Sequence, residues 1–180
     1  MEIIQTDIEG LLIIKPKVFE DDRGYFFESF RLDSIRNAGI TLKFIQENES
    51  KSGKNVLRGL HFQNPPFAQG KLVRVVKGAV LDVAVDIRKK SPAYGKWFAH
   101  ELSGENKMMM WIPPGFAHGF LTLEDETIFQ YKCTNYYNKE SEGSIRWNDP
   151  QLNIDWHVQE PGVSEKDKNA PMFNELKSKF

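Results

Sequence analysis

The feature that most constrains the fold is a run of short apolar segments between about residues 11 and 137. Each segment is rich in Val, Ile, Phe or Tyr and is followed by Gly, Pro, Asn or Asp, which is typical of antiparallel strands joined by turns. So many short strands in one small chain favour an all-β sandwich or barrel. We predict ten strands, at residues 11–19, 24–30, 42–50, 56–63, 71–78, 79–88, 95–102, 107–114, 119–123 and 127–137.

The rest of the chain adds little regular structure. Residues 31–39, RLDSIRNAG, predict one short helix that Gly39 ends. After residues 147–150, WNDP, the chain becomes polar and aperiodic, which favours a tail packed on the barrel over a second domain. We therefore interpret residues 1–180 as a single domain.

The charge balance excludes several classes of function. Lys and Arg number 24 against 25 Asp and Glu, so the formal net charge is −1 and leaves no basic excess for nucleic acid. The N-terminus carries acidic residues and no signal-peptide pattern, and no run of about 18 apolar residues predicts a membrane span. We expect a cytoplasmic protein with neither nucleic acid nor membrane as a partner. Cys133 is the only cysteine, so no internal disulfide is possible.

Strand alternation indicates which side chains share a face. In the segment at 79–88, Leu81 and its alternating apolar neighbours form one face, and Asp82 lies on the other, which we expect to be wet or functional. In VLRGLHFQ, residues 56–63, the same rule places Arg58 and His61 on opposite faces. Gly59 lies between them, and a glycine inside a strand often marks a bulge. We predict that Gly59 lets both side chains reach one cavity.

Two histidines stand next to informative motifs. His61 alone could be an ordinary structural histidine, but His118 ends the pattern P-x-G-x-x-H in PPGFAHG, which resembles the second motif of the cupin barrels. Metal-binding cupins supply an H-x-H pair and a glutamate in their first motif. Here His61 is followed by Phe and Gln, and Lys71 stands near the place of the acidic ligand. A protonated lysine repels a cation and offers it no lone pair, so we predict acid–base chemistry without a metal or other cofactor.

The segment at 127–137 carries two tyrosines, Tyr131 and Tyr137, on one face of a predicted strand. Either could be an ordinary strand tyrosine that packs by its ring. A tyrosine across a pocket from a histidine can instead move protons on the opposite side of a substrate, as inversion of a stereocentre requires.

The motifs together resemble the dTDP-4-dehydrorhamnose 3,5-epimerase family. The similar segments are DDRGYFFESF, VLRGLHFQ, QGKLVRVVKGAVLDVAVDIR, WIPPGFAHGF, YKCTNYY and SEKDKNAP, in this order over nearly the whole chain. The resemblance implies a cupin-like jelly roll and a homodimer without a metal. It implies isomerisation of a dTDP-linked 4-keto-6-deoxyhexose at C3 and C5 in dTDP-L-rhamnose synthesis.

The resemblance also implies roles for single residues. His61 would be the base, Asp167 the carboxylate that orients it, Tyr131 the opposing acid, and Lys71 the cation near the sugar O4. Arg23 and Arg58 would clamp the diphosphate, with Lys166 beside the site. Phe19 and Phe26 would belong to a segment that crosses to the neighbouring subunit and helps to build its nucleotide site. The other binding residues implied are Glu28, Gln46, Asn48, Asp82, His118 and Tyr137.

Other functions stay open at this stage. A metal-dependent cupin would need more ligands than the four histidines provide, because His100 and His157 lie far from both motifs. A sugar-binding barrel without activity would need the pocket but not the acid and base. A sister enzyme could act at one carbon only or on a related 4-keto sugar.

Overall fold

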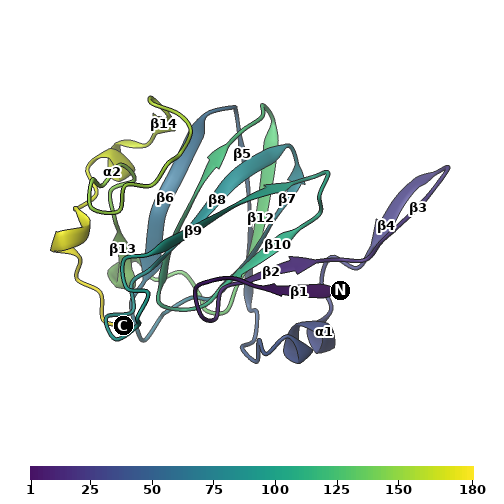
Figure 1. Cartoon of the computed structure of the whole chain (residues 1–180), viewed down its shortest axis with the longest axis horizontal. Coiled ribbons are helices and arrows are strands. Elements are labelled where there is room, and N and C mark those ends of the chain that lie inside the picture. The colour runs from purple at the N-terminus through teal and green to yellow at the C-terminus, as the bar shows by residue number, and fades with distance from the viewer.

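A computed structural model of the chain describes all 180 residues as a mainly antiparallel β protein (Figure 1). Two short α-helices, α1 (Leu32–Asn37) and α2 (Glu165–Lys168), and two 3₁₀ turns at Lys139–Ser141 and Phe173–Glu175 complete it. None of its helices is long and apolar enough to cross a membrane. The strands are β1 (Glu2–Gln5), β2 (Leu12–Lys15), β3 (Val18–Asp21), β4 (Gly24–Phe27), β5 (Gln46–Ser52), β6 (Val56–Gln63), β7 (Lys71–Lys77), β8 (Ala79–Asp86), β9 (Trp97–Ser103), β10 (Met109–Ile112), β11 (Phe116–Thr122), β12 (Thr127–Cys133), β13 (Glu142–Ser144) and β14 (Gly162–Val163).

Two sheets form the body of the molecule. The first has the order β1-β2-β10-β7-β12-β5, and the second has the order β13-β6-β11-β8-β9, with β14 added beside β6. Strands distant in sequence therefore lie next to one another, as in a jelly roll. Apolar side chains of both sheets, among them Val73, Val80, Phe120 and Phe129, form the core between the sheets. The predicted all-β class is confirmed.

The C-terminal segment covers the outer face of the second sheet. Ile145, Leu152, Trp156 and Phe173 are buried there in one cluster with outward-facing residues of β6, β8 and β11. The tail is therefore packed on the barrel as predicted, and α2 lies next to β6 (Figure 1).

Strand β8 has no solvent-exposed face. Every residue from Ala79 to Asp86 is buried, so the expectation that the Asp82 face could be in contact with water is wrong. Leu81 and Val83 pack under the C-terminal segment, whereas Val80 and Ala84 face the core between the sheets. Both faces of this central strand are covered because the tail covers the side that would otherwise meet water.

Strand β6 is interrupted at the predicted glycine. Gly59 has φ +142°, and the pairing of β6 with β11 shifts register between His118 and Phe120. A Cβ atom on Gly59 would stand 2.5 Å from the Cα atom of Gly119, so the two strands approach more closely here than any side chain permits. As a result Arg58 and His61 line the same cavity, which confirms the prediction.

Several element boundaries differ from the prediction. The strand predicted at 11–19 is divided into β2 and β3, because Pro16 lies between them and lacks the N–H group that a ladder needs. The strand predicted at 127–137 ends at Cys133, so Tyr137 follows it in a loop. The helix predicted at 31–39 spans Leu32–Asn37, and Gly39 follows it with φ +87°.

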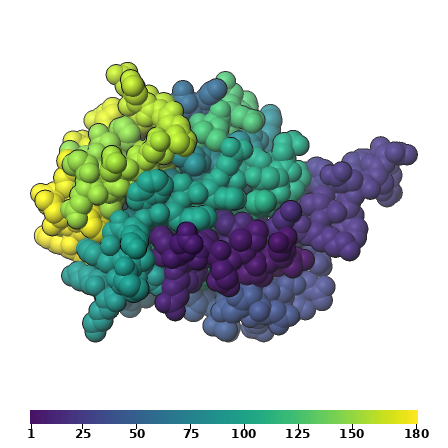
Figure 2. Space-filling view, viewed as in Figure 1, coloured from purple at the N-terminus to yellow at the C-terminus, as the bar shows by residue number.

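Strands β3 and β4 form a two-stranded hairpin that pairs with neither large sheet. It extends from the body as a separate arm, shown in purple in Figures 1 and 2. Its aromatic side chains are open to solvent, with Phe19 53% exposed and Phe26 66% exposed. Such exposure of large apolar groups is typical of a surface that a partner covers.

Candidate active site

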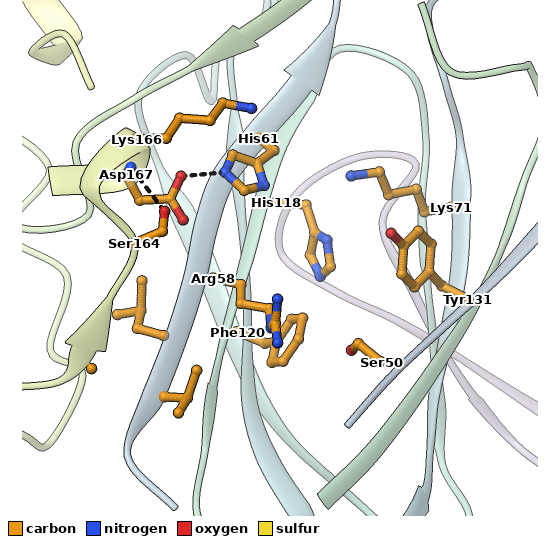
Figure 3. A pocket seen from close by; sticks show the side chains of 13 residues that line it. Ser50, Arg58, His61, Lys71, His118, Phe120, Tyr131, Ser164, Lys166 and Asp167 are labelled. Carbon is orange, nitrogen blue, oxygen red and sulfur yellow. Dashed lines mark hydrogen bonds and ion pairs between the residues drawn. The ribbon is translucent and has the colours of Figure 1, made fainter. Parts of the chain in front are cut away.

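A cavity of about 490 Å³ opens between the two sheets (Figure 3). Strand β6 supplies one wall, β7 and β12 supply the opposite wall, and α2 closes one side. Polar and charged side chains dominate a lining that lies next to an apolar core. The residues that line it are Ser50, Val56, Leu57, Arg58, His61, Lys71, His118, Phe120, Tyr131, Gly162, Ser164, Lys166 and Asp167.

His61 and Asp167 form a close pair on the β6 side of the cavity. Nε2 of His61 lies 2.6 Å from Oδ1 of Asp167, and the side chain of Asp167 is only 4% exposed (Figure 3). The backbone N–H of Gly59 donates to the carboxylate over 3.4 Å. The backbone of Asp167 is held as well, because its own N–H donates to Oγ of Ser164 over 3.1 Å. Burial alone would raise the pKa of Asp167, but the bonds from His61 and Gly59 together lower it. Asp167 is therefore an ionised group that orients His61.

Tyr131 and Lys71 face this pair from the opposite wall (Figure 3). Burial raises the pKa of Tyr131, so its hydroxyl keeps its proton at neutral pH. Burial lowers the pKa of Lys71, and the nearby Cys133 and Asp82 offset this only in part. The Lys71 ammonium lies 5.9 Å from the centre of the Tyr131 ring. A proton donor and a cation thus stand together across the cavity from the His61 imidazole.

A second histidine–aspartate pair lies deeper. His118 is the direct cross-strand neighbour of His61, and its Nε2 is 3.0 Å from both carboxylate oxygens of Asp82. Burial lowers the pKa of His118. Asp82 is fully buried and does not itself line the cavity, because its carboxylate is taken up by the contact with His118. Its binding role stays a prediction.

The remaining predicted binding residues of the body lie at or beside the cavity. Arg58 and Lys166 line it directly, and each is held by a neighbour: Arg58 donates to Ser52, and Lys166 lies 2.5 Å from Glu142. An adjoining hollow of about 140 Å³ shares His61, Lys71 and Tyr131 with the main cavity. Its other lining residues are Gln46, Asn48, Phe62, Gln63, Gln69, Tyr137 and Glu142.

Four predicted binding residues on or just after the hairpin line neither the cavity nor the adjoining hollow. Arg23 on the hairpin is 89% exposed and pairs with its neighbour Asp21 over 2.6 Å. Phe19 and Phe26 lie with it around a separate hollow of the hairpin. Glu28 follows the hairpin and its carboxylate lies 3.6 Å from Arg31. One chain alone therefore does not bring these residues to its own cavity.

Two hydroxyl groups of the site were not predicted from the sequence. Ser50 on β5 lines the cavity, and its buried Oγ has no hydrogen-bond partner. Ser164 precedes α2 and accepts the hydrogen bond from Asp167 N–H. The pattern S-x-x-D at 164–167 is an N-cap signal that could have placed Ser164, whereas no pattern marks Ser50.

The acidic and histidine side chains are spread over separate pairs. Nowhere do three His, Cys, Asp or Glu side chains gather as a metal site would need. His100 contacts Met108 and His157 contacts Asp155, both away from the cavity. Chemistry without a metal stays a prediction that a chelator experiment tests.

The chain matches known proteins over nearly its full length. Residues 5–175 match the family model described as dTDP-4-dehydrorhamnose 3,5-epimerase. The chain belongs to the dTDP-4-dehydrorhamnose 3,5-epimerase family. A member of the family from Shigella flexneri is 55% identical over 174 residues, which cover 96% of each chain.

Solved structures of the family have the same fold. A 3,5-epimerase from Legionella pneumophila in complex with dTDP-4-keto-L-rhamnose is 52% identical, with a TM-score of 0.93 over 97% of this chain and 94% of that one. A 3′-monoepimerase from Streptomyces bikiniensis in complex with dTDP-quinovose is 34% identical, with a TM-score of 0.88 over 93% and 85%. The predicted jelly-roll fold of the 3,5-epimerase family is confirmed.

Proposed function

We propose that this enzyme converts dTDP-4-dehydro-6-deoxy-D-glucose to dTDP-4-dehydro-L-rhamnose by epimerisation at C3 and C5, in dTDP-L-rhamnose biosynthesis. Family membership over residues 5–175 supports the activity, and the Legionella relative bound to dTDP-4-keto-L-rhamnose supports the substrate class. The observation that carries the mechanism is the 2.6 Å contact between His61 and Asp167 across the cavity from Tyr131.

The reaction needs a base on one side of the sugar and an acid on the other. Both C3 and C5 flank the C4 ketone, so removal of a proton from either carbon gives an enolate. His61 removes this proton, and Asp167 stabilises the imidazolium that forms. Each general acid or base of this kind contributes about 10²–10⁴-fold to the rate.

Tyr131 returns a proton to the opposite face, which inverts the carbon. Its raised pKa keeps the hydroxyl protonated until the enolate accepts the proton. Lys71 is placed to stabilise the negative charge that develops on O4. Because this charge forms only during the reaction, the ammonium binds the transition state more tightly than the substrate.

The nucleotide part of the substrate needs groups from two chains in this proposal. Arg58 and Lys166 bind the diphosphate, and Gln46, Asn48 and Tyr137 bind the thymidine in the adjoining hollow. The exposed hairpin of a second subunit adds Arg23, Phe19 and Phe26, with Glu28 at its base. This assigns the enzyme a homodimeric state, and a cytoplasmic location remains the expectation for a sugar-nucleotide enzyme.

Proton exchange tests the proposal. Chelator-treated protein is incubated in D₂O with dTDP-4-keto-6-deoxyglucose, and deuterium at C3 and C5 is followed by NMR. We expect label at both carbons, and loss of label in His61→Ala. Activity that vanishes with the chelator and returns with a metal would support a metal-dependent cupin. Absence of label despite tight binding would leave a sugar-binding protein.

A single-centre epimerase is the second candidate. The Streptomyces bikiniensis relative, described as a 3′-monoepimerase, shows that a 34% identical chain with this fold acts at one carbon. Deuterium at C3 alone in the experiment above would favour this assignment over the 3,5-epimerase. Residues that line one cavity can support either outcome, because the count of inverted centres depends on how Tyr131 meets the sugar ring.

A further inference from the structure

Tyr137 lies in a segment that has no regular backbone pairing. Strand β12 ends at Cys133, and no backbone group of residues 135–137 bonds to another backbone group. Tyr137 is 57% exposed and lines the hollow that adjoins the cavity. A short segment without partners would sample many conformations, and a ligand that stacks on its tyrosine would lose affinity because it has to order the segment.

Gln63, the last residue of β6, replaces several of the missing backbone partners. Gln63 is buried, and its Nε2 donates to the backbone oxygens of Tyr136 over 3.1 Å and Phe67 over 2.7 Å. Its Oε1 accepts from the backbone N–H of Asn138 over 2.7 Å. Only one orientation of the amide satisfies all three bonds, because the nitrogen must face the two carbonyl groups and the oxygen the N–H. Gln63 therefore holds the chain on both sides of Tyr137.

Two further glutamines hold the same segment. Gln69, in the loop before β7, donates from Nε2 to the backbone oxygen of Asn135 over 2.8 Å. Gln46, at the start of β5, accepts at Oε1 from the backbone N–H of Tyr137 over 2.9 Å. We call Gln46, Gln63 and Gln69 the glutamine clamp. Since β5 belongs to the first sheet and β6 to the second, the clamp ties the segment to both sheets.

The clamp stands at the place where the ring of Tyr137 meets the hollow. All three of its glutamines line that hollow together with Tyr137. The hydroxyl of Tyr137 donates to Oε2 of Glu142 over 3.3 Å, and the side chain makes no other hydrogen bond. The backbone of the segment therefore decides where this exposed ring lies, and the clamp decides the backbone.

We infer that Gln63 and Gln69 are positioning residues for nucleotide binding, which hold Tyr137 at the hollow before the nucleotide arrives. The inference rests on the proposed function for the role of Tyr137 as a thymidine contact. A ring that is already in place loses less conformational freedom on binding, so the clamp raises affinity through Tyr137. Loss of the clamp should accordingly raise KM and the Kd for dTDP and leave kcat nearly unchanged.

Amide hydrogen exchange in the free enzyme tests the preorganisation without any substitution. The backbone N–H groups of Tyr137 and Asn138 are bonded to glutamine oxygens, whereas that of Asn135 has no acceptor. We expect Tyr137 and Asn138 to exchange at least about tenfold more slowly than Asn135, after correction for intrinsic rates and before any nucleotide is added. Equal rates for the three amides in NMR spectra would overturn the inference.

A double-variant cycle tests whether Gln63 acts through Tyr137. Calorimetry gives the Kd for dTDP of Gln63→Met, Tyr137→Ala and the double variant. We expect the Kd to rise about tenfold in Gln63→Met and about 10- to 100-fold in Tyr137→Ala. In the Tyr137→Ala background, Gln63→Met should add less than about twofold, because no ring is left to position. An equal loss in both backgrounds, or no loss in Gln63→Met alone, would overturn the inference.

The variant Gln69→Met keeps the test decisive if Gln63→Met fails to fold. Gln69 is half-buried and gives up one hydrogen bond to the segment, so we expect an unchanged circular dichroism spectrum and a Kd for dTDP raised about threefold. The matched control is Gln151→Met, which alters an exposed glutamine outside the clamp and should leave the Kd unchanged. A folded Gln69→Met chain with unchanged dTDP affinity would overturn the role of Gln69.

These measurements separate the inference from the proposed function, because none of them needs turnover. Unchanged dTDP affinity in Tyr137→Ala alone would overturn both the thymidine contact and the inference. Deuterium at C3 and C5 together with additive losses for Gln63 and Tyr137 would overturn the inference alone. Coupled losses in a protein that exchanges no protons would support the clamp and overturn the epimerase.

Discussion

The cavity and the β3–β4 hairpin are built in opposite ways. In the cavity, each reactive side chain is fixed by another part of the same chain, as Asp167 fixes His61 and Asp82 fixes His118. In the hairpin, Arg23 contacts only its neighbour Asp21, and Phe26 is largely exposed. The difference teaches that the groups for chemistry are preorganised within one subunit, whereas the hairpin residues lie apart from the cavity of their own chain, as the proposed binding role in a second chain requires.

The largest expected effect comes from removing the base of the cavity. His61→Ala should lower kcat by about 10²–10⁴-fold, because it removes the base and leaves the binding groups in place. Steady-state kinetics and calorimetric titration with dTDP measure the two effects separately. A loss of dTDP affinity as large as the loss of kcat would mean that His61 acts in binding or folding.

The binding role of the hairpin is tested by Arg23→Ala combined with Phe26→Ala. We expect KM to rise about 10- to 100-fold, as for the loss of a hot spot, with a fold unchanged by circular dichroism because both side chains are exposed. The same substitutions on an arm that works within its own chain would also raise KM, so this result alone does not assign the arm to a partner.

Mixing two impaired proteins, assayed at a substrate concentration far below the raised KM, tests whether the hairpin acts in the neighbouring subunit. Chains with His61→Ala and chains with the double hairpin substitution are unfolded and refolded together at equal concentration. If hairpins cross between subunits, each mixed dimer has one intact site, and about a quarter of all sites regain activity. No regain in mixtures shown to contain mixed dimers would place each hairpin with its own cavity.

The charge that Lys71 places in the cavity should lower the stability of the fold. Lys71→Met replaces a half-buried ammonium by an apolar chain of similar length, and we expect Tm to rise by roughly 2–4 °C while turnover is lost. The sign follows from the lowered pKa, since the folded state disfavours the charged form that the unfolded chain keeps at neutral pH. Calorimetry of the variant checks this, and an unchanged or lower Tm would contradict it.

The smallest expected effect is on the stability of the fold at acidic pH. The pKa of Asp167 is lower in the folded protein, so its carboxylate stabilises the fold above the unfolded pKa of about 3.9, and this contribution is lost as pH falls through the folded value. Urea midpoints of Asp167→Asn and the unmodified protein should therefore differ at neutral pH and approach each other as pH falls below about 3.9. A difference that persists in acid would assign Asp167 a purely steric role.

The sequence predicted the central strands best. Strand β6 was predicted at its exact bounds because its apolar residues end at clear turn residues on both sides. Strands β1, β13 and β14 were missed because two to four residues are too few to show alternation. The site at Arg58 and His61 was predicted because Gly59 interrupts an otherwise regular strand. Ser50 could not be predicted, since only tertiary packing distinguishes it from other strand serines.

Where a residue lies relative to distant parts of the chain was harder to predict from the sequence. The segment at 127–137 has a continuous pattern of aromatic residues, yet the strand ends at Cys133 because the chain turns toward the adjoining hollow. Alternation along β8 indicated that Asp82 leaves the apolar face, but the pattern cannot tell a wet face from a buried polar one. Asp82 is buried because it contacts His118, and His118 lies on another strand, so alternation along β8 cannot reveal this contact.

The close approach of Gly59 to Gly119 limits how the substrate range can be changed. Neither position accepts a side chain without separating β6 from β11, and that separation would move Arg58 and His61 relative to each other. A mutagenesis library for new sugar nucleotides should therefore keep both glycines and vary Ser50, Gln46 and Tyr137 instead. The backbone at this crossing fixes the separation of Arg58 and His61, whereas side chains elsewhere around the cavity and the adjoining hollow are free to vary.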